Sequence, residues 1–138
     1  MNEKKCVIVL DENLPTGVLC NTAAILGVTI GKQVPESVGT DVKDADKKEH
    51  LGIIATPIPI LKSNKDNIYS LRQKLFDSNF SDVITADFSD VAQCCQTYDD
   101  YIAHASSTPE MNYQYFGIAL YGDKKKINRL TGSMPLLR

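Results

Sequence analysis

Short apolar runs alternate along the chain with segments of helical periodicity. Four runs are predicted to be strands, at residues 6–10, 51–61, 82–88 and 113–121. The first, Cys6 to Leu10, is continuous and rich in β-branched residues, which is typical of a central strand covered on both faces. The second contains Pro57 and Pro59, and proline cannot donate to a β-ladder. We therefore expect that strand to lie at a sheet edge or to stop near Thr56.

Apolar residues at helical spacing predict helices between and after these strands. The helices are expected at residues 17–31, 64–77, 89–105 and 123–131. Thr16 is the expected N-cap of the first helix, and Gly132 stands at the usual position after the last. The third has one apolar stripe, made of Val91, Cys94, Cys95, Tyr98, Tyr101, Ile102 and Ala105.

This order of elements predicts a single α/β domain over residues 1–138, a three-layer sandwich. We expect a four-stranded sheet, mostly parallel or mixed, with helices on both faces. The polar residues 32–50 form an excursion from this pattern, and the apolar tail 133–137 is expected to dock. With 138 residues and 43% apolar composition, the chain can bury a core without a disulfide or a metal.

The formal charge of −2 excludes a protein that binds nucleic acid through global positive charge, so nucleic acid is not an expected partner. The charge is unevenly distributed. Residues 81–110 carry six acidic residues and no lysine or arginine, whereas residues 121–138 are basic. Two solvated faces of opposite sign would explain this pattern. Alternatively, the run Lys124 to Lys126 attracts an anionic ligand or an acidic partner.

The four cysteines are Cys6, Cys20, Cys94 and Cys95, and none has Cys-x-x-Cys spacing. We expect them to be reduced and structural, in a cytoplasmic protein. Only His50 and His104 could complete a metal site, and neither has an evident cysteine constellation. No metal site and no cofactor are therefore predicted. The uncharged residues 13–31 are too interrupted to span a membrane, and a helix at a core or subunit interface explains them better.

Open α/β sheets bind ligands beyond the carboxyl ends of their strands, which predicts a cleft near the first helix. The candidate site residues are Asp11, Asn13, Thr16, Gly17, Asn21 and Asp87. Asp87 would be a polar anchor or a catalytic base, and Asn21, expected to be buried, would orient a loop or contact a ligand. The N-terminus of the first helix would hold an anion. The alternative is that Asp11 and Asp87 are capping or turn residues.

Three segments carry a resemblance to a known family. They are Lys5 to Leu10 followed by Asp11, Leu14 and Gly17; Val83 to Asp87; and Ile118 to Gly122 with Ile127 to Leu137. Together they resemble the type II peptidyl-tRNA hydrolases, and the closing Leu-Thr-Gly-Ser-Met-Pro-Leu-Leu-Arg resembles a sister family of small bacterial proteins. The resemblance implies an α/β sandwich around a four-stranded mixed sheet, often dimeric, with the family's aspartate at Asp87. The family's catalytic lysine and glutamine are replaced here by Val18 and Thr22.

The leading interpretation is a homodimer that binds a small molecule or an anion and lacks peptidyl-tRNA hydrolase activity. One alternative is a hydrolase acting on peptidyl-tRNA or a related ester. Another is a structural interaction protein that uses the uncharged face of residues 17–31. No membrane association is expected.

Overall fold

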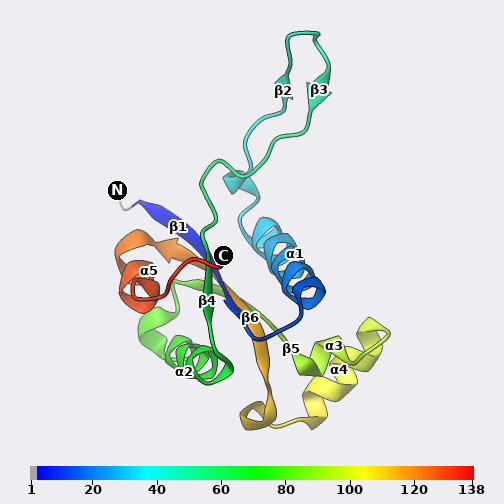
Figure 1. Cartoon of the computed structure of the whole chain (residues 1–138), viewed down its shortest axis with the longest axis vertical. Coiled ribbons are helices and arrows are strands. Elements are labelled where there is room, and N and C mark those ends of the chain that lie inside the picture. The colour runs from blue at the N-terminus through cyan, green and yellow to red at the C-terminus, as the bar shows by residue number, and fades with distance from the viewer. Residues whose placement is uncertain (1–2) are drawn as a thin grey trace.

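Four strands form one mixed sheet in the order β4-β1-β6-β5 in the computed structural model, which describes residues 3–138 (Figure 1). The central strand β1 (Lys4–Asp11) is parallel to β4 (Ile60–Ser63) and antiparallel to β6 (Tyr115–Asp123). The strand β5 (Ile84–Ser89) pairs antiparallel with β6 and forms one edge. The expected central position of the first strand and the mixed sheet are both confirmed.

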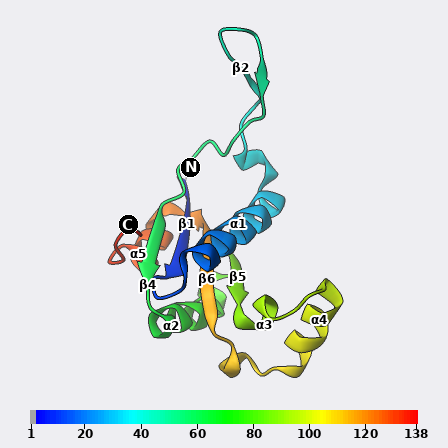
Figure 2. The ribbon, with the colours of Figure 1, turned by 45° about the vertical axis from the view of Figure 1, so that its right-hand side comes forward.

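Helices cover both faces of this sheet. Successive side chains of β1 point to opposite sides, so apolar residues of this strand lie on each face. Val7 and Val9 pack in the cluster that includes residues of α2 (Lys65–Leu75) and α5 (Lys124–Thr131). Ile8 and Leu10 pack in the other cluster, against α1 (Thr16–Gln33). Figure 2 shows α1 on one side of the sheet and α2 on the other. The four-stranded α/β architecture predicted from the sequence is therefore present.

The second strand begins later than the sequence predicts. Pro57 and Pro59 precede β4, which starts at Ile60. The prolines belong to an irregular segment before the strand, so no strand stops near Thr56. The edge position is confirmed. The C-terminal tail pairs with that edge, since Leu137 N donates to Ile60 O at 2.9 Å and Lys62 N donates to Pro135 O at 2.9 Å. The tail therefore docks as expected and covers the exposed side of β4.

The polar excursion forms a projecting arm, residues 38–55, in which β2 (Val42–Lys43) pairs antiparallel with β3 (Glu49–His50) (Figure 1). A short 3-10 helix, η1 (Pro35–Ser37), connects α1 to this arm. At the tip, the Asp44 carboxylate accepts backbone hydrogen bonds from Asp46 and Lys48. This local capping explains how a strongly polar segment holds a turn.

The predicted helix over 89–105 is two helices, α3 (Asp90–Gln93) and α4 (Tyr98–Ser107), so a single helix was the wrong prediction. Thr97 begins the second one, because its side chain accepts from Asp100 N at 3.1 Å. The chain turns at the break, and Tyr98 and Ile102 are 73% and 55% exposed rather than in the core. The helices α3 and α4 instead pack against each other.

Two further 3-10 helices, η2 (Ser78–Phe80) and η3 (Glu110–Asn112), precede β5 and β6. The helix α5 ends at Thr131, directly before Gly132, as expected. Asn64 caps α2 through its side chain, which accepts from Asn67 N. Thr16 is the first residue of α1 and not its cap. Pro15 holds the cap position, and a proline side chain accepts no hydrogen bond. Within residues 3–138, no helix combines the length and apolar composition needed to cross a membrane.

Candidate functional site

The predicted cleft residues at the start of α1 mostly serve local structure or face solvent. Asp11 is 3% exposed at the end of β1, and its carboxylate accepts from Asn13 N at 3.0 Å. This bond is the turn-forming role considered as the alternative for Asp11. Asn13, Thr16 and Gly17 are exposed.

The expectation that Asn21 is buried is wrong, because its side chain is exposed. The buried polar residue is its neighbour Thr22, which is fully buried and whose hydroxyl oxygen has no hydrogen-bond partner. Thr22, Leu26 and Ile30 form the buried stripe of α1 at a spacing of four residues. Asn21 precedes that stripe by one position, and this rotates its side chain away from the sheet. Cys20, which is exposed, also lies off the stripe.

Asp87 lies apart from Asp11, because β6 stands between β5 and β1. Its Oδ2 accepts from Arg72 Nε of α2 at 2.9 Å, and both side chains are mostly buried. The Arg72 guanidinium also stacks on the Phe76 ring at 3.8 Å from its centroid. The structure therefore does not bring Asp87 together with the α1 residues, and it joins Asp87 to α2 instead.

Asp87 does line a hollow of about 490 Å³ beside β5, within the range of small-molecule sites. We call it the β5 hollow. Its walls come from α1, β5, α3, the turn after α3, and α4. They are formed by Ile25, Thr29, Ala86, Asp87, Phe88, Ala92, Cys95, Gln96, Thr97, Tyr98 and Tyr101. Asp87 is the sole carboxylate among these residues, and none of them is a lysine or arginine.

Two titratable side chains that line the β5 hollow, Tyr101 and Cys95, have raised pKa values. Burial and the nearby negative charge of Asp87 raise the pKa of the Tyr101 hydroxyl, which keeps it a hydrogen-bond donor. Burial and the adjacent Cys94 raise the pKa of the Cys95 thiol. The Tyr98 ring meets Tyr101 edge-on at 5.5 Å between centroids. The β5 hollow thus combines one acidic lining residue, one phenol donor and an otherwise largely apolar and aromatic wall.

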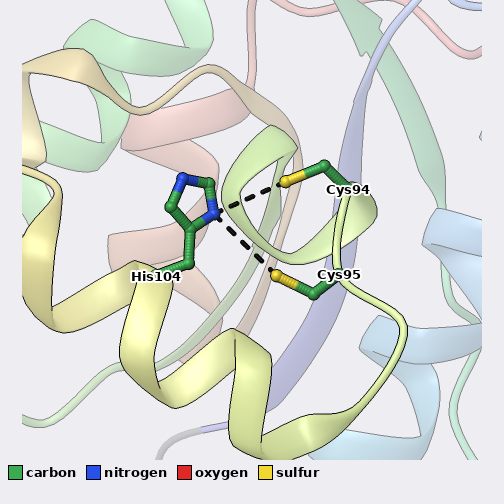
Figure 3. Close-up of side chains that lie close together, drawn as sticks. All are labelled: Cys94, Cys95 and His104. Carbon is green, nitrogen blue, oxygen red and sulfur yellow. Dashed lines mark hydrogen bonds between the residues drawn. The ribbon is translucent and has the colours of Figure 1, made fainter.

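One wall of the β5 hollow adjoins a cluster that sequence reasoning missed, made of Cys94, Cys95 and His104 (Figure 3). The Sγ atoms of Cys94 and Cys95 lie 3.4 and 3.8 Å from His104 Nδ1. A single helix over 89–105 would place His104 far from both thiols. The signal for the break was present in Thr97-Tyr98-Asp99-Asp100, a Ser/Thr-x-x-Asp/Glu capping pattern. That pattern begins a second helix, which can fold back on the first.

The return of the chain from α4 to the sheet is anchored by Glu110. Its carboxylate accepts from Tyr115 OH at 2.6 Å, from Gln73 Nε2 at 2.8 Å and from Tyr69 OH at 3.0 Å. Burial opposes ionisation of Glu110, but these hydrogen bonds outweigh it and hold the pKa of the carboxyl below its usual range. This network ties η3 to α2 and to β6, and so fixes the far end of the α3–α4 segment.

A second hollow, of about 480 Å³, lies between the start of α2 and the C-terminal tail. We call it the α2 hollow. Its lining includes Lys62, Lys74, Asn64 and Ser133, together with Glu12. The α2 hollow is more polar than the β5 hollow and carries two cationic side chains.

Comparisons with known proteins identify relatives without assigning an activity. A family model described as a protein of unknown function, DUF2000, matches residues 4–138. A solved structure of a protein of unknown function from Agrobacterium tumefaciens superposes with a TM-score of 0.89 at 17% identity, and the match covers 100% of both chains. At that identity the likeness concerns the fold alone. No curated protein matched the chain.

Proposed function

The chain belongs to the DUF2000 family of proteins of unknown function, and we propose that it binds a small organic cation in the β5 hollow. The observation that carries this proposal is a largely apolar and aromatic hollow lined by one acidic residue, Asp87, and by no basic residue. A carboxylate that water screens incompletely attracts a cation, although Arg72 already pairs with Oδ2 of Asp87. A ligand with an amino group and an apolar body therefore fits this site best.

The aromatic side chains support the same ligand chemistry. Tyr98 and Tyr101 both line the β5 hollow, and the faces of tyrosine rings attract cations. The Tyr101 hydroxyl stays protonated and can donate to a carbonyl or ether oxygen of the ligand. Ile25 and Phe88 provide apolar contact area for the rest of the molecule. Arg72 shares Asp87 with any ligand, which lowers the affinity that this carboxylate alone would confer.

The experiment is a thermal-shift screen with aromatic and aliphatic primary amines, followed by calorimetric titration of each hit. A ligand at 100 times its dissociation constant should add about 2.7 kcal/mol to the free energy of unfolding. Asp87→Asn should weaken binding by about tenfold or more, as expected for a lost hydrogen bond to a charged group. The matched control is Asp46→Asn, which removes an exposed carboxylate of the projecting arm that does not line the hollow. Equal affinities in the two variants would refute the proposal.

Anion binding in the α2 hollow is the second candidate, favoured by Lys62 and Lys74. Titration with inorganic phosphate tests it, and Lys74→Gln should abolish any stabilisation that phosphate produces. Phosphate stabilisation that persists in this variant would place the anion elsewhere.

We further propose that two copies of the chain associate through the projecting arm and α1. Leu51 and Ile53 of the arm are 83% and 79% exposed, and Val28 of α1 is 75% exposed. Exposed apolar groups of this kind favour burial against another protein surface. Sedimentation velocity should show a dimer that Leu51→Ser with Ile53→Ser weakens, whereas Lys48→Ser, on the same arm, leaves it intact. A monomer at all concentrations would refute this association.

Hydrolysis of peptidyl-tRNA, which the sequence resemblance implies, is the competing enzymatic proposal. Val18 and Thr22 stand where that family has its lysine and glutamine, and Asp87 is held by Arg72. These observations favour binding without hydrolysis. Turnover of peptidyl-tRNA by the purified protein, lost in Asp87→Asn, would favour the hydrolase instead.

A further inference from the structure

The turn after α3 and the last turn of α4 bring three metal-ligating side chains to one point. Figure 3 shows both sulfur atoms of Cys94 and Cys95 directed toward the His104 ring. Their Sγ atoms and His104 Nδ1 all lie within 4.8 Å of one another. Among the described residues, 3–138, this is the one such group of three cysteine, histidine or acidic side chains.

The spacing of the three atoms matches what a tetrahedral metal ion requires. Zinc binds cysteine sulfur at about 2.3 Å and histidine nitrogen at about 2.0–2.1 Å, which places sulfur and nitrogen ligands roughly 3.6 Å apart. The two sulfur-to-nitrogen distances here are 3.4 and 3.8 Å. A bound ion would therefore require only small movements of the side chains. Thiolate and imidazole ligands favour borderline-soft ions such as Zn²⁺ over Mg²⁺ or Ca²⁺.

The same three groups are poorly satisfied by protein partners. The carbonyl oxygen of Val91 lies 3.2 Å from Cys95 Sγ, 3.6 Å from Cys94 Sγ and 3.0 Å from His104 Nδ1. One carbonyl oxygen has two lone pairs and cannot accept fully from three donors. Metal binding removes this competition, because both thiols lose their protons and the imidazole proton is carried by Nε2.

We propose that Cys94, Cys95 and His104 form a binding site for Zn²⁺ or an ion of similar softness. The three side chains supply three of the four ligands of a tetrahedral ion. The Val91 carbonyl oxygen, 3.0–3.6 Å from all three ligand atoms, is within reach of the fourth position. Cys95 also lines the β5 hollow, so the ion would stand at the wall of that hollow. The proposal does not depend on the organic-cation site, since Asp87 is not one of the three metal-ligating residues.

The electrostatic surroundings favour a cation at this point. Asp99 and Asp100 occupy the first turn of α4, the helix that carries His104. Cys94 is exposed, which gives an ion access from solvent without opening the core. A disulfide between the adjacent cysteines would be an alternative use of the two thiols, but it would not involve His104.

The test uses the full chain, fully reduced, with Co²⁺ as a spectroscopic probe and Zn²⁺ as its competitor. We expect one Co²⁺ per chain, sulfur-to-cobalt charge-transfer bands, intense d–d bands of tetrahedral cobalt, and displacement by Zn²⁺. Cys94→Ser and His104→Gln should each weaken Zn²⁺ binding by at least about tenfold, measured by competition with a chromophoric chelator. Because Cys94 is exposed, its variant should fold, and circular dichroism checks this.

The matched controls are Cys20→Ser, which removes an exposed thiol of α1, and His50→Gln, which removes the exposed histidine of the arm. Neither should change Zn²⁺ affinity. Absence of cobalt–sulfur bands in protein with four reduced thiols would overturn the proposal. Affinity that is unchanged in Cys94→Ser, or equally reduced in Cys20→Ser, would also overturn it. Loss of amine binding in Asp87→Asn with metal binding intact would separate this site from the proposed ligand site.

Discussion

The hydrogen bond between Tyr115 and Glu110 should contribute a measurable coupling to stability. Tyr115 is 2% exposed, and its hydroxyl lies 2.6 Å from the Glu110 carboxylate. A bond of this length to an ionised acceptor is charge-assisted. Such bonds contribute about 1.5–3 kcal/mol when fully shielded. Glu110 is only half-buried and accepts from Gln73 and Tyr69 as well, so we expect about 1 kcal/mol of coupling.

A double-mutant cycle isolates this coupling. The variants are Tyr115→Phe, Glu110→Gln and the combination, and each removes one partner with little change of shape. Each single change should lower the free energy of unfolding by about 1–2 kcal/mol, because a polar group loses its partner in a partly dry site. The double variant should lose less than the sum of the two single losses. The difference is the coupling energy.

Urea unfolding at neutral pH, followed by far-ultraviolet circular dichroism, is the appropriate assay because the chain has no tryptophan. The urea dependence of the free energy should stay the same in all variants, which shows that the same surface is exposed on unfolding. Tyr121→Phe is the matched control, since Tyr121 lies on the same strand but packs on the opposite face of the sheet. A coupling below about 0.3 kcal/mol, or equal to that between Tyr121→Phe and Glu110→Gln, would refute the reasoning.

Three further measurements test the core and the Glu110 network. Thr22→Val should raise the free energy of unfolding by about 1 kcal/mol, because it replaces a buried hydroxyl that has no partner by a methyl group, and a decrease would contradict this. Gly117→Ala should lower it by about 1–3 kcal/mol, since a Cβ there would stand 2.7 Å from Leu10 Cδ2 and 3.0 Å from Val9 O, and unchanged urea unfolding would contradict it. The lowered pKa of Glu110 stabilises the fold above its unfolded pKa of about 4.3, and this contribution is lost as pH falls through the folded pKa. The stability difference between wild type and Glu110→Gln should therefore shrink in acid, and a constant difference across that range would contradict the assignment.

The sheet and its covering helices could be predicted because each depends on a local pattern. The continuous apolar run of Cys6 to Leu10 indicates a strand that is buried on both faces. The spacing of Ile68, Leu71 and Leu75 after Asn64 indicates an amphipathic helix with a capping residue. Both signals lie within a few residues of the element that they predict. The same holds for the apolar tail, whose composition indicated docking although not its partner strand.

The candidate site could not be predicted in the same way, because it depends on contacts between segments distant in the sequence. Asp87 and Arg72 are on different elements, and the strand order that separates Asp87 from Asp11 follows from long-range pairing. The error at Asn21 has a different cause. A shift of one residue on a helix rotates a side chain by about 100°, so a mostly apolar helix leaves the buried stripe ambiguous.

Several of the acidic residues in 81–110 already have partners within the protein. Asp82 pairs with Lys126 at 2.8 Å and Asp87 with Arg72 at 2.9 Å, while Glu110 is occupied by three hydrogen bonds. In the part of the chain that the structure describes, Asp99 and Asp100 form no such ion pair with a lysine or arginine. Their negative charge therefore remains at the first turn of α4, beside Cys95 and next to the β5 hollow. A field of this sign favours an amine in the hollow and a divalent ion on its wall, and it disfavours the phosphate backbone of a tRNA at the same place.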